Sequence, residues 1–260
     1  IILMKDMKKL IVANWKMNPE KLKDAVRIFS AIKKSASTMK NVDTVVCSPF
    51  VYIPDLKKKA TSQKCVLGAQ DTFYAESGSY TGEVSPTQLK NLGVKYIILG
   101  HSERRALGET NSDVSKKIGM CIKHMMTPVV CVGELSRDNS GNHFQFIKDQ
   151  VTQTLAGIPR SALSRIVIAY EPVWAIGKNA VREATPEEAE EMIIFIKKVI
   201  SENYNMSSYP KIQMLYGGSA SSQNAKSFLD KRVIDGLLVG RASLDPKELS
   251  AILKIANIKF

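Results

Sequence analysis

Cysteine is scarce in this chain, and the spacing of its four cysteines matches no metal-binding or redox motif. Cys47, Cys65, Cys121 and Cys131 form no CxxC pair, which argues against a zinc ribbon and a thioredoxin-type site. Cys47 and Cys131 each follow a pair of valines, where a reduced thiol packs as a small apolar side chain. We therefore expect buried thiols, no metal site and a reducing compartment, the cytoplasm.

Long apolar runs and linker-like stretches are also missing. No apolar run approaches the roughly 20 residues that cross a bilayer, so we expect no transmembrane helix and no membrane partner. No stretch rich in glycine, serine or proline divides the 260 residues, and this length suits one large α/β domain. The sequence predicts a single domain over 1–260, in which residues 1–8 form a frayed N-terminal extension.

Acidic residues are too few to balance the basic ones: 25 Asp and Glu stand against 37 Lys and Arg, a formal net charge of +12. Such a charge suits a nucleic-acid binder or an enzyme that attracts small anions. The excess is mostly lysine spread along the chain, without the interleaved aromatic residues that single-strand binders use. We expect no specific nucleic-acid partner.

What the chain does contain is a series of eight short apolar runs, at 10–15, 42–48, 65–70, 95–100, 127–133, 165–171, 211–216 and 235–240. Continuous rather than alternating apolarity indicates strands buried on both faces of a parallel sheet. Helical patterns separate the runs, and three of them begin with a capping oxygen, a proline and a Glu or Gln, at 85–88, 185–188 and 245–248. Eight such units favour an α/β fold of the closed (β/α)8 barrel type over an open doubly wound sheet. The first run is followed by no GxGxxG motif, which counts against a dinucleotide site.

In such a barrel, the working residues lie at the carboxyl ends of the strands and in the loops after them. Small residues follow the seventh and eighth runs, namely Gly217, Gly218, Ser219 and Gly240. Small residues expose backbone N–H groups, and these bind phosphate without a basic side chain. Glycine pairs also simply make turns, so this placement indicates a phosphate site without establishing it.

Three titratable residues stand at other strand ends. Glu171 follows an apolar strand, where burial favours a carboxylate that takes up a proton; the alternative is a structural carboxylate. His101 should open a short helix, whose N-terminus favours a neutral imidazole. Lys16 either faces an anion or is an ordinary solvated lysine. Together, these groups suggest proton abstraction beside a carbonyl in a phosphorylated substrate.

The chain resembles the triosephosphate isomerase family in eight motifs that occur in the family's order: ANWKMN (13–18), GAQ (68–70), SGSYTGEVSP (77–86), ILGHSERR (98–105), VCVGE (130–134), AYEPVWAIG (169–177), YGGS (216–219) and DGLLVGRASL (235–244). The resemblance implies a TIM barrel. It also implies interconversion of dihydroxyacetone phosphate and D-glyceraldehyde 3-phosphate through an enediolate, in glycolysis and gluconeogenesis, with no cofactor.

Roles for individual residues follow from the same resemblance. Glu171 would be the base and His101 the neutral electrophile, the carboxylate–imidazole pair for which this family is the standard example. Lys16 would stabilise the enediolate and attract the phosphate, Asn14 would position substrate oxygens, and Glu103 would hold Lys16. Backbone N–H groups would bind the phosphate at Gly177, Ser219, Gly240 and Arg241.

Residues 172 to about 182 resemble the family's mobile lid, which folds over the substrate. Its first part, called the lid below, consists of Pro172, Val173, Trp174, Ala175, Ile176 and Gly177. Tyr216 and Ser219 resemble residues that hold the lid closed. The sequence after Gly177 departs from the family, because AIGKNAVREATP is two residues longer than the usual AIGTGKTATP. We expect a lid that still closes but opens with different kinetics.

A second departure is Arg241, which stands where the family usually has glycine. Backbone binding of phosphate survives this change if φ at 241 is negative. The side chain either points to solvent or a carboxylate, or adds positive charge near the phosphate.

The segment Phe73–Glu83 resembles the family's third loop, which inserts into a neighbouring subunit. Thr81 would then reach the Asn14 region of its partner in a homodimer; otherwise the segment is a polar surface loop. Two other functions stay open. One is a different phosphate-binding barrel enzyme, and the other is a catalytically weakened barrel that binds polyanions through its positive charge.

Overall fold

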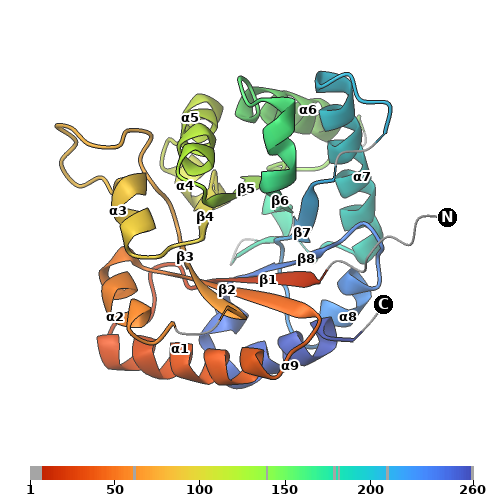
Figure 1. The fold of residues 1–260 in the computed structure, drawn as a ribbon. Coiled ribbons are helices and arrows are strands. Elements are labelled where there is room, and N and C mark those ends of the chain that lie inside the picture. Colours follow the sequence, from red (N-terminus) through yellow and green to blue (C-terminus); the bar gives the residue numbers. More distant parts are fainter. Residues whose placement is uncertain are drawn as a thin grey trace.

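The computed structural model describes residues 8–60, 63–138, 140–177, 180, 182–208 and 211–258. Eight parallel strands pair in chain order and close on themselves, with β8 beside β1 (Figure 1). They are β1 Lys9–Asn14, β2 Val42–Ser48, β3 Cys65–Ala69, β4 Tyr96–Leu99, β5 Thr127–Val132, β6 Val167–Tyr170, β7 Gln213–Tyr216 and β8 Gly236–Val239. All eight predicted strands are present, and closure into a barrel excludes the open doubly wound sheet.

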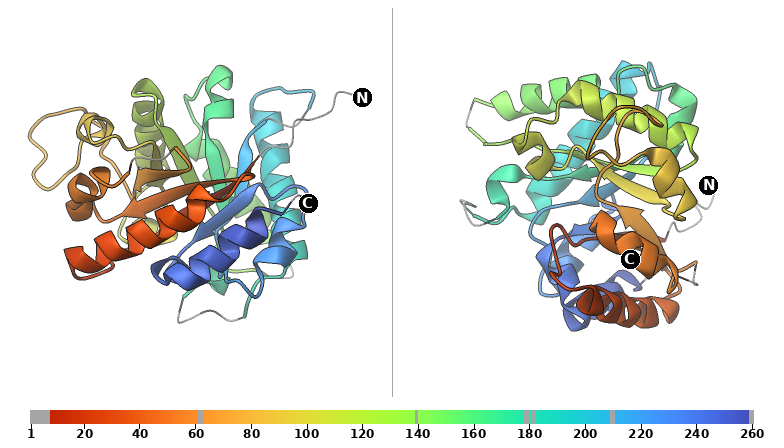
Figure 2. Two further views of the ribbon diagram at one scale, coloured as in Figure 1. Left: turned by 60° about the horizontal axis from the view of Figure 1, so that its bottom comes forward. Right: turned by 90° about the vertical axis from the view of Figure 1, so that its left-hand side faces the viewer.

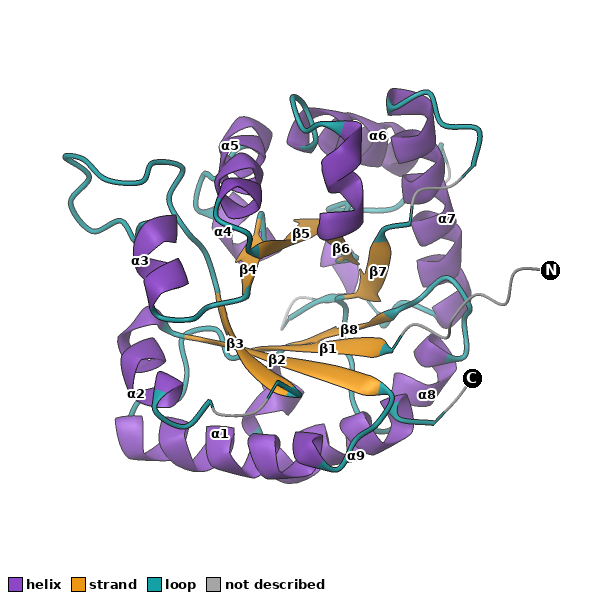
Figure 3. Cartoon of the chain, in the orientation of Figure 1, coloured by secondary structure: helices purple, strands orange, loops and turns teal. Residues whose placement is uncertain are grey.

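Helices surround the barrel on the outside, as the purple ribbons around the orange strands in Figure 3 show. They are α1 Leu22–Ser37, α2 Ile53–Lys57, α3 Pro86–Asn91, α4 Ser102–Ala106, α5 Asn111–Lys123, α6 Asn142–Thr154, α7 Pro186–Asn203, α8 Ala225–Leu229 and α9 Pro246–Ala256. Short 3₁₀ turns at Phe50–Tyr52, Arg160–Arg165, Val173–Ala175 and Arg241–Leu244 complete the described elements. Neighbouring helices follow each other around the ring in chain order (Figure 2).

Two of the three expected capping boxes form, at Ser85 before α3 and at Thr185 before α7. The third site behaves differently. Asp245 caps α9 by accepting a hydrogen bond from a backbone N–H at 2.8 Å, but Glu248 accepts hydrogen bonds from the N–H and Oγ of Ser222 at 2.6 and 3.0 Å. The carboxylate therefore ties the β7–α8 loop to α9 instead of closing the box.

The strands are buried on both faces, as their continuous apolarity predicts. Leu10 and Val12 of β1 belong to the cluster inside the barrel, while Ile11 and Ala13 pack outward among the helices. Side chains alternate along a strand, so an all-apolar strand needs an apolar neighbour on each side. The barrel interior is filled, and the functional groups are displaced to its ends.

The four cysteines are all free and buried. Burial raises the pKa of the Cys65 thiol to about 12, and it raises the pKa of Cys131 well above its usual value. Among the described residues, no helix is long and apolar enough to cross a membrane. The expectation for residues 1–8 falls outside the described chain except at Lys8, whose Nζ lies 3.2 Å from Asp43.

Candidate active site

A cavity of about 850 Å³ lies at the carboxyl ends of the strands. The predicted catalytic and phosphate-binding residues all line it: Asn14, Lys16, His101, Glu103, Glu171, Gly177, Ser219, Gly240 and Arg241. They come from loops after β1, β4, β6, β7 and β8. Parallel strands place these loops at one end of the barrel, which is why residues far apart in sequence share one cavity.

Glu171 directly follows β6 and is only 2% exposed. Its position depends on two glycines from neighbouring strands. A Cβ at Gly133 would lie 1.6 Å from the Glu171 carbonyl oxygen, and a Cβ at Gly217 would lie 2.9 Å from its Cγ. A side chain at position 133 would displace the backbone of Glu171, and one at position 217 would displace its side chain. Gly217, the first glycine of the YGGS motif, thus makes room for Glu171. The resemblance of this motif to a phosphate-binding loop did not indicate that role.

The two carboxylate oxygens of Glu171 have different surroundings. Oε2 accepts a hydrogen bond from the Ser102 N–H at 3.0 Å. Oε1 has no hydrogen-bond partner within the described structure and lies 3.1 Å from Nε2 of His101; this close approach lacks hydrogen-bond geometry. The buried carboxylate is thus held by one oxygen, while the other is available to a ligand in the cavity.

His101 is the N-cap residue of α4, and its Nδ1 accepts a hydrogen bond from the Glu103 N–H at 3.2 Å. A ring nitrogen that accepts a hydrogen bond carries no proton, so the neutral ring is protonated at Nε2. This tautomer is inferred from the hydrogen bond. It directs an N–H donor towards the cavity, as an electrophile requires.

Lys16 adopts the left-handed region with a φ of 52°, which costs about 1–2 kcal/mol for a non-glycine residue. Three hydrogen bonds hold this conformation in place. The Lys16 N–H donates to Asn14 Oδ1 at 3.0 Å, and Gln70 Nε2 donates to the carbonyls of Lys16 at 2.8 Å and Cys47 at 3.0 Å. The Lys16 ammonium then lies 2.5 Å from Glu103 Oε1.

The Gln70 contact is a functional feature that the sequence did not assign. Gln70 stands in the GAQ motif at the end of the third apolar run, so its place after a strand was the available signal. Its partners are Lys16, in the loop after β1, and Cys47, near the end of β2. The parallel pairing of β1 with β2 and of β2 with β3 brings these residues together.

The predicted phosphate-binding residues include Ser219, in the loop after β7, and Gly240, which follows β8. A Cβ at Gly240 would stand 3.6 Å from Cε of Lys16, so the backbone of Gly240 runs beside the lysine stem. Arg241 begins the turn after β8 and is not among the described non-glycine residues with positive φ. Its exposed side chain lines the cavity and makes no ion pair within the part of the chain described here.

Within the lid, only Ile176 and Gly177 line the cavity. Trp174 points away from it and donates from Nε1 to Glu134 Oε1 at 2.8 Å. Ser219 Oγ donates to the carbonyl of Ala175 at 3.3 Å, whereas the Tyr216 ring stacks on Phe228. In the altered sequence after the lid, Lys178, Asn179 and Val181 lie outside the described residues.

Thr81 does not line the cavity of its own chain. It is exposed on the segment Phe73–Glu83, which projects from the barrel in both Figure 1 and Figure 2. The base of the segment is closed by the Phe73 N–H, which donates to the Val84 carbonyl at 2.8 Å. The Phe73 ring lies 4.5 Å from that of Tyr80, so the loop packs partly on itself.

Comparison with known proteins gives a consistent result over nearly the whole chain. The profile of the family described as triosephosphate isomerase matches residues 9–256. A triosephosphate isomerase from Alkaliphilus oremlandii is 39% identical over 248 residues, which cover 95% of this chain and 98% of that protein. One from Natranaerobius thermophilus is 40% identical over 252 residues, covering 95% of this chain and 96% of that protein. The resemblance in the motifs is thereby confirmed, and the chain belongs to the triosephosphate isomerase family.

Proposed function

We propose that this protein interconverts dihydroxyacetone phosphate and D-glyceraldehyde 3-phosphate, as a step of glycolysis and gluconeogenesis. One observation carries the proposal. The unbonded Oε1 of buried Glu171 and Nε2 of His101 lie 3.1 Å apart in a cavity that also holds Lys16. A base beside a neutral hydrogen-bond donor is the arrangement that proton transfer next to a carbonyl needs.

The reaction then uses these groups in turn. Glu171 removes a proton from the carbon beside the carbonyl and returns it to the neighbouring carbon. His101 donates a hydrogen bond from Nε2 to the oxygen that becomes negative, and it passes a proton between the two oxygens. Lys16 stabilises the enediolate through its positive charge, while Glu103 keeps the ammonium in position.

The phosphate group needs no basic side chain in this scheme. Backbone N–H groups of Gly177, Ser219, Gly240 and Arg241 surround it, and Asn14 positions the other substrate oxygens. The lid excludes water when it closes, because an enediolate phosphate in free solution loses its phosphate. No metal or cofactor takes part in any of these steps.

We further propose a cytoplasmic homodimer formed through the segment Phe73–Glu83, with Thr81 near Asn14 of the partner subunit. Apolar exposure supports this contact. Met17, in the loop after β1, is 93% exposed and Tyr80, on the projecting segment, is 46% exposed, so both apolar side chains are free to pack against a partner subunit. The barrel is proposed to form one domain.

The test is a coupled isomerisation assay with D-glyceraldehyde 3-phosphate, comparing the wild type with Glu171→Asp. The shorter side chain moves the carboxylate by about one carbon–carbon bond, and a displacement of about 1 Å can reduce the rate by about 10²-fold. Circular dichroism shows whether the variant remains folded. A folded wild type that turns over slowly would contradict the proposal.

A further inference from the structure

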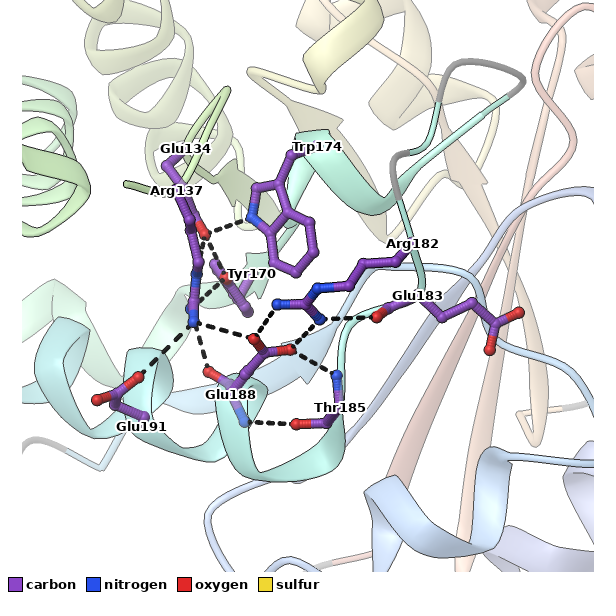
Figure 4. A network of polar contacts seen from close by, with 9 residues as sticks. All are labelled: Glu134, Arg137, Tyr170, Trp174, Arg182, Glu183, Thr185, Glu188 and Glu191. Carbon is purple, nitrogen blue, oxygen red and sulfur yellow. Dashed lines mark hydrogen bonds and ion pairs between the residues drawn. The ribbon is translucent and has the colours of Figure 1, made fainter. Parts of the chain in front are cut away.

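Trp174 of the lid is tied to the barrel through Glu134, which follows β5 and is 1% exposed. Oε1 of Glu134 accepts hydrogen bonds from Trp174 Nε1 at 2.8 Å, Tyr170 OH at 2.8 Å and Arg137 Nε at 2.9 Å. Tyr170 belongs to β6 and is fully buried. Glu134 is therefore a fixed anchor, and Figure 4 shows the indole directed at it.

A second contact reaches Trp174 from beyond the lid. The guanidinium carbon of Arg182 lies 4.6 Å from the centre of a Trp174 ring, within the range of a cation–π interaction. The same guanidinium donates to both carboxylate oxygens of Glu188, at 2.9 and 2.5 Å. This bidentate pair is the geometry that arginine favours with a carboxylate.

Glu188 is itself held in place by α7. It is the third residue of that helix and closes the capping box with Thr185, whose N–H donates to Glu188 Oε2 at 2.8 Å. Hydrogen bonds from Arg182 lower the pKa of Glu188 to about 2, so it is ionised at neutral pH. Arg182 thus connects Trp174 to the start of α7, as Figure 4 shows.

We propose that Arg182 is a positioning residue for the lid, which favours the conformation seen here by holding Trp174 against Glu134. This inference rests on the proposed function, because it assumes that a bound phosphate compound draws Gly177 into the cavity. Trp174 lies three residues before Gly177, while Glu134 and Glu188 belong to the barrel and α7. Moving the lid towards the phosphate separates Trp174 from partners that stay behind.

A contact made in only one of two conformations shifts the equilibrium between them by its own strength. An exposed cation–π contact corresponds to about a 2- to 5-fold change in an equilibrium constant, whereas the Arg182–Glu188 ion pair stays in both conformations. Without Arg182, the lid should close more readily. The affinity for a ligand that closes it should therefore rise by about 2- to 5-fold, and KM should fall.

The experiment measures binding of 2-phosphoglycolate, a two-carbon phosphate whose carboxylate resembles the enediolate, by the full chain. Tryptophan fluorescence reports directly on the contact, because the chain has two tryptophans and the other, Trp15, is fully buried. The variants are Arg182→Gln, Glu188→Gln and the double variant. Glutamine at 188 keeps an acceptor for the capping box.

Lys231→Gln is the matched control. Its ammonium lies 2.9 Å from both Glu187 and Glu190 of the same helix, and it has no contact with Trp174. We expect the two single variants to bind 2-phosphoglycolate about 2- to 5-fold more tightly, with a changed emission of the free protein. The double variant should gain little beyond Arg182→Gln, and the control should match the wild type.

Two results would overturn the inference. Unchanged affinity and emission in both single variants would mean that Arg182 does not position Trp174. Weaker binding in Arg182→Gln would mean that its contacts belong to the closed lid. A wild type that neither binds 2-phosphoglycolate nor isomerises triose phosphates would instead refute the proposed function, and this inference with it.

Discussion

A buried ion cluster of Lys117, Asp71 and Glu109 adjoins the chain segment that carries His101, and removing its cation tests the structure directly. Lys117 of α5 is 4% exposed. Its Nζ lies 2.8 and 3.0 Å from the two oxygens of Asp71 and also contacts Glu109. Glu109 in turn accepts a hydrogen bond at 3.0 Å from the N–H of Gly100, the residue before His101. We therefore expect Lys117→Met to affect both stability and catalysis.

The expected loss of stability follows from the carboxylates that Lys117→Met leaves buried without their cation. Burial opposes the charge on Lys117, but Asp71 and Glu109 outweigh it and raise the pKa of the ammonium. Without this cation, two carboxylates remain buried, with Arg104 at 3.0 Å from Asp71 as a partly exposed cation. Removing one partner of a buried pair typically costs about 3–5 kcal/mol. In a chain of this size, the loss lowers Tm by roughly 6–20 °C.

The loss of stability in Lys117→Met should depend on pH. Burial already raises the pKa of Asp71, and removing Lys117 takes away a group that lowers it. A carboxyl group whose pKa is higher in the folded than in the unfolded protein takes up a proton on folding. The Lys117→Met variant is thus least destabilised at pH values near and below the pKa that Asp71 has in the unfolded protein. Its destabilisation grows as the pH rises through the pKa that Asp71 has in the folded protein.

The assay is urea unfolding of the wild type and Lys117→Met at pH 5 and pH 8, with Lys198→Met as control. Lys198 forms an exposed pair with Glu202 at 3.9 Å, so its loss should change the free energy of unfolding by less than about 1 kcal/mol. The reasoning is refuted if Lys117→Met resembles this control at pH 8. It is also refuted if the variant loses more stability at pH 5 than at pH 8.

Three further predictions concern the cavity and its surroundings. Gln70→Ala removes the donor to the Lys16 and Cys47 carbonyls, so kcat/KM should fall by about 2- to 10-fold, the value of one or two hydrogen bonds; unchanged steady-state kinetics would show that Lys16 holds its conformation unaided. Arg241→Gly should raise KM for the dianionic substrate and weaken its dependence on salt, and a KM equal to that of the wild type at every salt concentration would place the side chain away from the phosphate. Cys131 should react with a thiol reagent at pH 8 only after unfolding, because burial keeps its pKa well above the usual value; rapid labelling of the native protein, located by mass spectrometry, would contradict this.

The fold and the identity of the cavity residues could be predicted from the amino-acid sequence. Runs such as 42–48 and 127–133 predicted strands that end within one residue of those observed, because burial on both faces leaves a continuous apolar signal. Asn14, Lys16, His101 and Glu171 could be grouped in advance, since each follows a strand and parallel strands end on one side.

How those residues are held depends on contacts between segments that are distant in sequence. The conformation of Lys16 depends on Gln70, which lies 54 residues away. Glu248 does not close the expected capping box; instead it accepts a hydrogen bond from Ser222, which lies 26 residues away. Arg182 belongs to a stretch without a helix or strand pattern, yet it contacts both Trp174 and Glu188. Local sequence encodes strands, helices and caps through neighbouring residues, whereas contacts such as those of Gln70 and Glu248 form only once βα units distant in sequence pack side by side.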